Sequence, residues 1–264
     1  MLDSTAIWTD VAAIGAQRPL VHNVTNYVVM DMTANALLAL GASPVMAHAD
    51  QEVEAMAAMA DAVVLNMGTL DAAWIDSMLR ALDAARTHGK PVAFDPVGAG
   101  ATPYRSATAR RILEQGGVSV LRGNASEIAS LAGAAGRTKG VDSVETSLEV
   151  ADAATDLTSC CDVIVISGEQ DVIVARDRRC VLANGCPMMT RVTGMGCTAT
   201  AVTGAFLAVR ADPFLAAAHA MAAMGIAGEL AGRTSPGPGT LRTHFLDALY
   251  TLDRETIAAR LRAE

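Results

Sequence analysis

The sequence predicts an α/β fold in which a mostly parallel central sheet carries helices on both faces, giving three layers. Short apolar segments alternate with longer segments of helical periodicity through residue 168. The apolar segments are nearly continuous and do not alternate with polar residues, which is typical of parallel strands covered on both faces. Hydrophobic residues make up 52% of the chain and aromatic residues only 3%, so we expect a core of aliphatic side chains between helices and a sheet.

Six apolar segments are expected to form the parallel strands, and a helix is expected between each consecutive pair among the first five. The predicted strands cover residues 19–23, 43–47, 61–67, 91–96, 118–123 and 162–168, and the predicted helices cover 26–41, 50–60, 71–89 and 102–115. This alternation is the pattern of a doubly wound sheet.

The pattern changes after the sixth predicted strand. Residues 171–184 form two apolar segments joined at Asp177 and Arg178, which predicts an antiparallel hairpin at the sheet edge. From residue 197 to the end the chain is expected to be almost wholly helical, with SPGPGT at 235–240 ending one helix and capping the next.

The domain organisation is expected to be simple. The most polar and least patterned segment, residues 138–147, is expected to be a mobile loop. The sequence contains no internal repeat and no linker long enough to divide it. We therefore expect residues 1–264 to form a single domain.

Charge and cysteine content exclude several classes of protein. A net charge of −8 disfavours a protein whose main partner is a nucleic acid. The first residues lack the basic and apolar regions of a signal peptide, and the apolar segment at 214–228 is too short and too rich in alanine to predict a membrane span. Five cysteines without paired spacing fit a reducing compartment, so we expect a cytoplasmic protein.

The residues that follow the predicted strands are the first candidates for a functional site, since open α/β sheets bind ligands at the carboxyl ends of their strands. These positions are rich in Gly, Asn, Asp, Glu, Ser and Thr, and they comprise residues 23–26, Met46, 66–69, 95–102, 122–127, 167–169 and 194–197. We expect this set to form one ligand-binding edge.

Two of these segments carry carboxylates suited to magnesium. Asp95 opens the glycine-containing segment DPVGAGAT, where it could hold a hydrated Mg²⁺ ion or form a local cap. In RGNASEI, Arg122 could reach a phosphate, and Glu127 could orient water around the same ion. The alternative for Asn124 and Glu127 is a capping box, which local spacing favours.

The segment VTGMGCT at 192–198 predicts an anion-binding turn. If a helix begins near Cys197, the backbone N–H groups of Met195, Gly196 and Cys197 have no helical partner and face an anion at its positive end. Such donors are what phosphoryl transfer requires. The same position predicts a lowered pKa for the Cys197 thiol. The alternative is that Cys197 is a small buried hydrophobic residue.

The segments VHNVTNYVVMDMTANALLALGASPVMAHA, LNMGTL, DPVGAGATPYR, RGNASEI, SGEQD and VTGMGCTATA occur in this order. Together they resemble the hydroxyethylthiazole kinase family of the ribokinase-like superfamily, over nearly the whole chain. The first segment and the Gly-Met-Gly-Cys turn are specific to that family. The resemblance implies transfer of the γ-phosphoryl group of ATP, with Mg²⁺, to the hydroxyl of 4-methyl-5-(2-hydroxyethyl)thiazole in thiamine synthesis and salvage.

The resemblance also implies roles for individual residues. Met46 and Gly194 match substrate-binding positions, and Asn26 is expected beside them. Arg122 and Ser167 match ATP-binding positions. Cys197 occupies the place where many ribokinase-like enzymes carry a catalytic aspartate. The family is described as a homotrimer with thiazole pockets at subunit contacts, so the same assembly is expected here.

Three other functions fit the same residues. One is a ribokinase-like kinase of another vitamin-precursor alcohol, of the hydroxymethylpyrimidine or pyridoxal type. A second is an ATP-dependent dehydratase of hydrated nicotinamide nucleotide, and a third is a nucleotide-binding protein without catalysis. The series Asp95, Arg122, Glu127 and Cys197 disfavours the third, because a binding protein does not need a group beside an acceptor hydroxyl.

Overall fold

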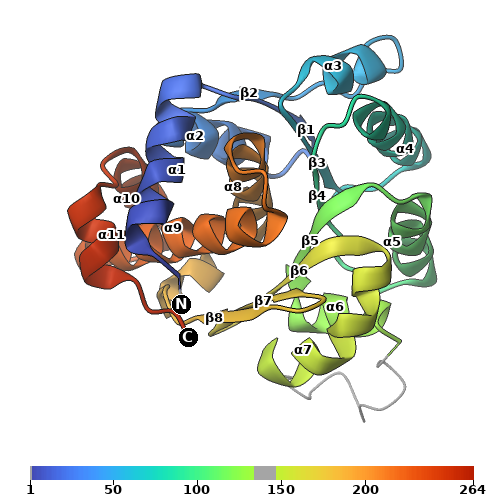
Figure 1. The fold of residues 1–264 in the computed structure, drawn as a ribbon. Helices are drawn as coiled ribbons and strands as arrows, with labels where there is room; N and C mark the ends of the chain where they lie inside the picture. Colours follow the sequence, from blue (N-terminus) through green and yellow to red (C-terminus); the bar gives the residue numbers. More distant parts are fainter. Residues whose placement is uncertain (1, 134–146) are drawn as a thin grey trace.

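Eight strands form one sheet in a computed structural model that describes residues 2–133 and 147–264 (Figure 1). The order across the sheet is β2-β1-β3-β4-β5-β6-β7-β8. The strands are β1 Leu20–Val24, β2 Ser43–Val45, β3 Ala62–Asn66, β4 Val92–Asp95, β5 Val118–Asn124, β6 Cys161–Ser167, β7 Asp171–Ala175 and β8 Arg179–Leu182. Strands β1 to β6 are parallel, and β7 and β8 add an antiparallel hairpin at one edge. The predicted mostly parallel sheet and the predicted edge hairpin are thus confirmed.

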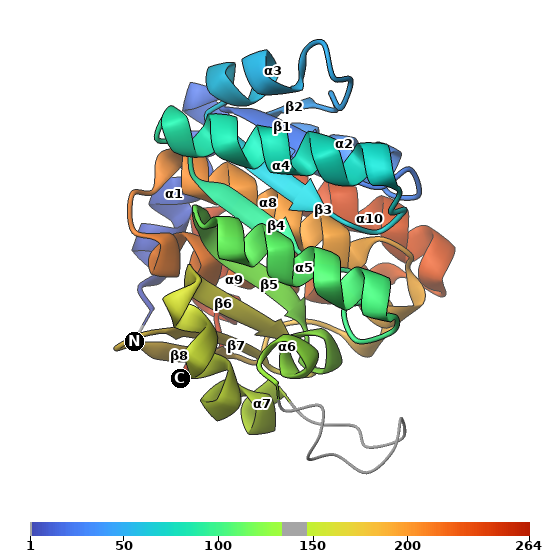
Figure 2. The same cartoon turned by 90° about the vertical axis from the view of Figure 1, so that its right-hand side faces the viewer.

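Helices cover both faces of the sheet, which confirms the three predicted layers. Figure 2 shows α4 and α5 on one side of the strands and α8 and α9 on the other. The α-helices are α1 Ser4–Gln17, α2 Met30–Leu40, α3 Val53–Met59, α4 Ala72–Thr87, α5 Pro103–Gln115, α6 Ala125–Leu131, α7 Ser147–Ala154, α8 Met195–Val209, α9 Pro213–Thr234, α10 Pro238–Tyr250 and α11 Arg254–Arg260. Two short 3₁₀ helices, Thr155–Ser159 and Pro187–Arg191, complete the described helical structure.

The central strands carry apolar side chains on both faces because each face packs against helices. In β3, Val64 belongs to the core shared with α8 and α9, whereas its neighbours Val63 and Leu65 belong to the core shared with α4 and α5. In β4, Ala93 and Phe94 divide between the two cores in the same way. Because successive side chains point to opposite faces of the sheet, each strand contributes residues to two separate cores.

Helix α2 begins four residues later than the periodicity predicts. Asn26 to Val29 form a turn in which the backbone N–H of Val28 donates to Asn26 Oδ1 at 3.1 Å. The N–H of Tyr27 donates to Thr69 Oγ1 at 3.2 Å, which ties this turn to the segment after β3. The turn leaves Asn26 at the carboxyl edge of the sheet instead of in a helix.

Helix α9 corrects the expectation for the late apolar segment. The segment at 214–228 belongs to a helix of 22 residues, long and apolar enough by composition to cross a membrane. However, 83% of its most apolar window is buried within the protein. Its burial, and not a short length, marks it as a core helix packed on α8, α10 and the sheet.

The ends of other elements follow the sequence closely. Each predicted strand is present with its ends shifted by two residues or fewer. The SPGPGT segment separates α9 from α10, although the cap residue Gly237 makes no side-chain hydrogen bond. The predicted loop at 138–147 lies outside the described residues, except for Ser147, which begins α7. The five cysteines, all of which are described, form no disulfide.

Candidate active site

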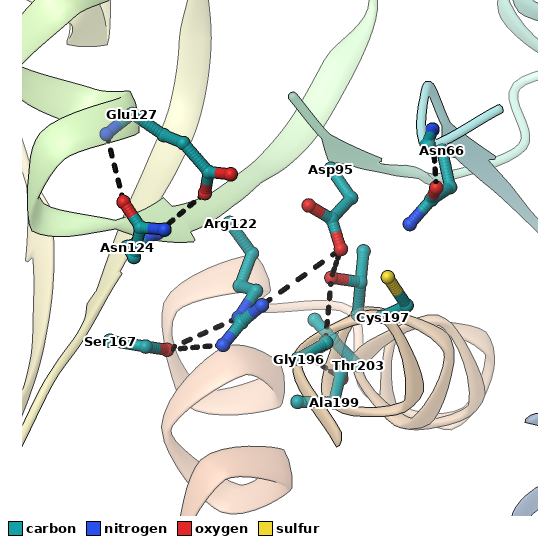
Figure 3. Close-up of polar contacts among 12 residues, drawn as sticks. Asn66, Asp95, Arg122, Asn124, Glu127, Ser167, Gly196, Cys197, Ala199 and Thr203 are labelled. Atoms are coloured by element: carbon teal, nitrogen blue, oxygen red, sulfur yellow. Dashed lines mark hydrogen bonds and ion pairs between the residues drawn. The ribbon is translucent and has the colours of Figure 1, made fainter. Parts of the chain in front are cut away.

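The carboxyl ends of the parallel strands meet the N-terminus of α8. Helix α8 packs on β1, β3 and β4, and the hydroxyl of Thr200 in its second turn donates to Asp95 Oδ2 at the end of β4, at 2.7 Å. Figure 3 shows Asp95 between the guanidinium of Arg122 and the side chain of Cys197. The strand-end residues and the Gly-Met-Gly-Cys turn, distant in sequence, therefore share one site.

The turn before α8 leaves its first amides free for a ligand. The first helical hydrogen bond runs from the N–H of Thr198 to the carbonyl of Gly194, at 2.8 Å. No hydrogen-bond acceptor for the N–H groups of residues 195–197 is found in the described part of the chain. Gly194 has a φ of 89°, a value that favours glycine. The side chain of Met195 is buried in the core, so only its amide can serve a ligand.

Arg122 connects the turn to the neighbouring strands. Its Nε and Nη2 atoms donate to Ser167 Oγ at 3.1 and 2.8 Å, and Nη1 lies 3.9 Å from Asp95 Oδ2. A Cβ atom added to Gly196 would lie 2.6 Å from Arg122 Nη1. The absence of a side chain at Gly196 therefore lets the guanidinium lie directly against the start of α8. The structure brings together four of the predicted residues here: Asp95, Arg122, Ser167 and Gly196.

The carboxyl group of Asp95 is almost fully buried, with 1% of the residue exposed. Burial is the main cause that raises its pKa to about 6, and the nearby charge of Glu127 adds to this rise. The charge of Arg122 and the side chains of Thr200 and Asn66 oppose it. The guanidinium is too distant to neutralise the carboxylate fully. The site thus holds an incompletely paired buried charge.

Glu127 forms the capping box that its spacing favours. Its Oε2 accepts from the backbone N–H of Asn124 at 2.9 Å, and Asn124 Oδ1 accepts from the N–H of Glu127 at 2.9 Å. Glu127 Oε1 also accepts from the N–H of Gly98 at 2.8 Å, which joins the segments after β4 and β5. Among the described residues, no three or more His, Cys, Asp or Glu side chains lie close enough together to hold a metal ion directly. The role of Asp95 and Glu127 toward magnesium stays a prediction.

The predicted lowering of the Cys197 pKa is wrong. Burial, assisted by the charge of Asp95, raises the pKa of this thiol to about 11. The side chains of Asn66 and Asn26, the latter with Nδ2 3.6 Å from the sulfur, lower the pKa in part but do not outweigh burial. Cys197 is therefore a neutral thiol at neutral pH.

The predicted substrate residues lie in two places. Asn26 is buried at the site, where its Nδ2 donates to Asn66 Oδ1 at 2.7 Å. Gly194 opens the turn beside it, and a Cβ there would meet the Val29 side chain. Met46 is half-buried after β2, the edge strand, which β1 separates from β3. Met46 therefore lies at the open edge of the sheet.

Three residues at the site were given no role by sequence reasoning. Asn66 was only one of many strand-end residues, and Thr200, which bonds Asp95, is inside a helix. Arg105 donates to the carbonyls of Met67, Val97 and Gly68 at 2.6 to 2.7 Å and so fastens two strand-end segments to α5. No short motif marks such contacts, since each partner comes from another part of the chain.

Comparison with known proteins agrees with the geometry. The sequence model of the hydroxyethylthiazole kinase family matches residues 11–255. A hydroxyethylthiazole kinase of Syntrophus aciditrophicus is 54% identical, over 97% of this chain and 95% of the relative. A solved hydroxyethylthiazole kinase structure from Pyrococcus horikoshii is 40% identical with a TM-score of 0.91 and covers 98% of both chains.

A more distant likeness concerns the fold alone. A Staphylococcus aureus pyridoxal kinase solved with AMP-PCP and pyridoxal has a TM-score of 0.60 at 17% identity, covering 80% of this chain and 88% of its own. The ribokinase-like fold is thereby confirmed. Given the family match over most of its length and the close relatives, the chain belongs to the hydroxyethylthiazole kinase family.

Proposed function

We propose that this protein transfers the γ-phosphoryl group of ATP to the hydroxyl of 4-methyl-5-(2-hydroxyethyl)thiazole, in thiamine synthesis and salvage. One observation carries the proposal. In a chain of this family, the free amides at 195–197 lie beside Arg122 and Asp95 at the carboxyl edge of the sheet. Positive groups held in place around one point suit the charge that a phosphoryl group carries during transfer.

The positive groups are supplied by two elements. The N-terminus of α8 presents backbone N–H groups and the positive end of the helix dipole. Arg122, at the end of β5, presents a planar guanidinium that Ser167 orients. In this arrangement Arg122 and Ser167 bind the ATP phosphates, and the amides of residues 195–197 contact the phosphoryl group in transfer.

The carboxylates of Asp95 and Glu127 fit a magnesium ion. Both are oxygen donors, and the charge of Glu127 raises the pKa of the buried Asp95, so a cation near them would relieve an uncompensated charge. Because both carboxylates already accept hydrogen bonds, they would hold the ion through its water molecules. When bound, the ion neutralises charge on the phosphates.

Cys197 has a positioning role in this proposal. Its thiol keeps its proton at neutral pH, since burial raises its pKa to about 11. A neutral thiol is a poor base for an alcohol, whose own pKa is far higher. Most of the rate acceleration therefore comes from orientation and from charge stabilisation by the amides and Arg122.

The acceptor alcohol binds beside Gly194 and Asn26, with Met46 contributing from the sheet edge. Large apolar side chains are exposed close to that edge: Tyr27 and Val28 before α2, Leu38 on α2 and Met59 on α3 are each 58–64% exposed. Apolar exposure of this kind supports the homotrimer with sites at subunit contacts. The expected mass in light scattering is three times 27.2 kDa.

The remaining parts of the proposal concern the chain as a whole. Strands between residues 20 and 182 share one sheet, which supports a single kinase domain over residues 1–264. Free cysteines and small soluble substrates support action in the cytoplasm.

Incubation of the purified protein with ATP, Mg²⁺ and the thiazole alcohol tests the proposal directly. The expected product is the phosphate ester, detected by mass, in amounts equal to the ADP formed. Hydroxymethylpyrimidine and pyridoxal serve as alternative acceptors in parallel. Faster turnover of either one, with none on the thiazole alcohol, would reject the proposed substrate while keeping the kinase.

A further inference from the structure

Asn66 is the last residue of β3, and only the oxygen of its side-chain amide forms hydrogen bonds within the described residues. Its Oδ1 accepts from Asn26 Nδ2 at 2.7 Å and from the backbone N–H of Gly68 at 3.0 Å. Only 1% of the residue is exposed, and Nδ2 has no hydrogen-bond partner in the described residues. The two bonds to Oδ1 fix the amide plane, so the direction of the free N–H₂ group is also fixed.

The free N–H₂ group faces the middle of the site. Asn66 and Asp95 are register partners on β3 and β4, and Asn26 Nδ2 reaches both Asn66 Oδ1 and Cys197 Sγ. Figure 3 shows the Asn66 side chain directed toward the space beside Cys197 and Asp95. Burial raises the pKa of both Asp95 and Cys197, and Asn66 lies close enough to lower each of them in part.

An unpaired donor in a buried position needs an explanation, because it loses its hydrogen bonds to water on folding. Asn66 Nδ2 can donate a hydrogen bond to an oxygen atom of a ligand. Arg122 and Ser167, which fit the ATP phosphates, lie on the other side of Asp95, on β5 and β6. Asn66 lies on the side of β1 and Asn26, where the acceptor alcohol is expected.

We propose that Asn66 is a further catalytic residue, whose Nδ2 donates a hydrogen bond to the hydroxyl oxygen of the acceptor alcohol. This inference rests on the proposed function and adds to it the group that holds the attacking oxygen. One lone pair of that oxygen accepts from Asn66, and another stays directed at the γ-phosphorus of ATP.

The reaction balances without a change in Asn66. A bond forms between the alcohol oxygen and the γ-phosphorus, and the bond from this phosphorus to the bridging oxygen of ATP breaks. The bond electrons leave with ADP, and the hydroxyl proton passes to solvent water. Asn66 keeps its protons throughout and restrains the oxygen within reach of the phosphorus.

A pair of ligands that differ only in the hydroxyl tests this contact. Calorimetry measures the affinity for 4-methyl-5-(2-hydroxyethyl)thiazole and for 4-methyl-5-ethylthiazole, each in the presence of a non-hydrolysable ATP analogue. The native protein is expected to prefer the alcohol by about tenfold, the usual size of one hydrogen bond to a buried donor. Equal affinities in the native protein would overturn the inference without any variant.

Two variants remove the donor. Asn66→Leu keeps the branched shape and Asn66→Ala removes it, and both are expected to abolish the preference for the alcohol. Both also lose Oδ1, so either could weaken the fold, but that loss affects the two ligands alike and cancels in the ratio. Asn184→Ala is the matched control, since Asn184 is a buried asparagine after β8 that bonds Glu229 and the Arg260 carbonyl. It is expected to lower stability and keep the preference.

The outcomes separate this inference from the proposed function. If the native protein phosphorylates the thiazole alcohol but an Asn66 variant keeps the full preference, the inference is wrong and the function stands. A weakening of ATP analogue binding in place of the alcohol preference would also overturn it, since Asn66 would then contact the nucleotide. If the native protein forms no thiazole phosphate, the proposed function has failed.

Discussion

Two buried aspartates with arginine neighbours lie in different parts of the molecule and differ in how completely they are paired. Asp10, on α1, accepts a hydrogen bond from Arg210 Nε that is shared between its two oxygens, at 3.0 and 2.9 Å, and another from Nη2 at 2.6 Å. The ring of His219 lies 2.6 Å from the same carboxylate. Asp95 accepts from the Thr200 hydroxyl, lies close to the Asn66 amide and has its arginine only at 3.9 Å.

The pKa values of Asp10 and Asp95 shift in opposite directions from the ordinary value of an aspartate. Burial raises the pKa of Asp10, but hydrogen bonds from His219 and Arg210 outweigh burial and hold it below 3.8. For Asp95 burial dominates and the pKa rises to about 6. A carboxylate that is satisfied by the protein joins α1 to α8 and α9, whereas one left partly unsatisfied can bind a ligand. The surroundings of Asp95 therefore lower the stability of the fold, whereas those of Asp10 raise it.

The largest expected effect comes from filling the space between α8 and Arg122. In Gly196→Val, the new side chain would displace the Arg122 guanidinium, which approaches to 2.6 Å of an added Cβ. We expect kcat/KM to fall by roughly a hundred- to a thousandfold, as when one positioned donor is lost. Because the displaced group is the end of a flexible side chain, the melting temperature should change little.

Gly204→Ala provides the matched control on the same helix. A Cβ at Gly204 would meet Val64 Cγ2 at 2.6 Å in the core, where neither partner can move freely. This variant is expected to lose about 1–3 kcal/mol of stability and to keep its kcat. Near-normal turnover in a Gly196→Val protein that binds ATP normally would contradict the role given to the α8 turn.

Removal of the charge of Asp10 is expected to weaken the fold and not the reaction. In Asp10→Asn, Arg210 and His219 lose their carboxylate, although Arg210 keeps partial contact with solvent, its side chain being 28% exposed. We expect the free energy of unfolding in urea at pH 7.5 to fall by about 2–4 kcal/mol. A kcat that falls in proportion would show that this cluster acts on the site.

The sign of the stability change is expected to reverse at Asp95. In the folded protein its pKa of about 6 exceeds the ordinary 3.8, so its contribution to stability is complete below 3.8 and is lost as the pH rises through 6. At pH 7.5 the ionised, buried group therefore destabilises the protein without ligands. Asp95→Asn is expected to gain roughly 1 kcal/mol of stability there, while its activity falls by less than that of Gly196→Val.

The pH dependence is the check on this prediction. The gain in Asp95→Asn is expected to disappear when unfolding is measured at pH 4, because native Asp95 is then protonated. For Asp10 the folded pKa lies below 3.8, so its contribution is present above 3.8 and is lost as the pH falls further. Asp95→Asn that is less stable than the native protein at pH 7.5 would mean that Arg122 pairs the carboxylate fully.

Much of the site could be predicted from the sequence because most of its residues follow the ends of parallel strands. Parallel strands end at the same edge, so Asp95, Arg122 and Ser167 could be placed near one another from strand positions alone. The turn at 194–197 joins them because a helix start after glycines is locally encoded. Glu127 was assigned two roles, and local spacing was sufficient for the capping box.

The errors come from quantities that depend on contacts distant in sequence. The pKa of Cys197 was predicted from its helix position, but burial and Asp95, about a hundred residues away, decide its direction. Asn66 could not be singled out from the sequence. Asn26 and Gly68 donate to its Oδ1 and so fix the direction of its N–H₂ group, and the contact with Asn26 spans 40 residues of the chain. Helix α1 was missed for a similar reason, since the contacts that stabilise it come from α8, α9 and α11.

The smallest expected effect tests the thiol itself. Cys197→Ala removes a group that is protonated at neutral pH and whose sulfur makes only weak contacts in the described residues, with Asn26 Nδ2 at 3.6 Å and with the Asn66 side chain. We expect kcat to fall by no more than about tenfold, far less than in Gly196→Val, because the backbone amides of the turn are unchanged. Cys161→Ala is the control, as burial also raises the pKa of this thiol, to about 12, at the opposite end of the sheet. A Cys197→Ala protein as inactive as Gly196→Val, with Cys161→Ala unaffected, would mean that the thiol takes part in proton transfer despite its raised pKa, and the positioning role would be replaced by a chemical one.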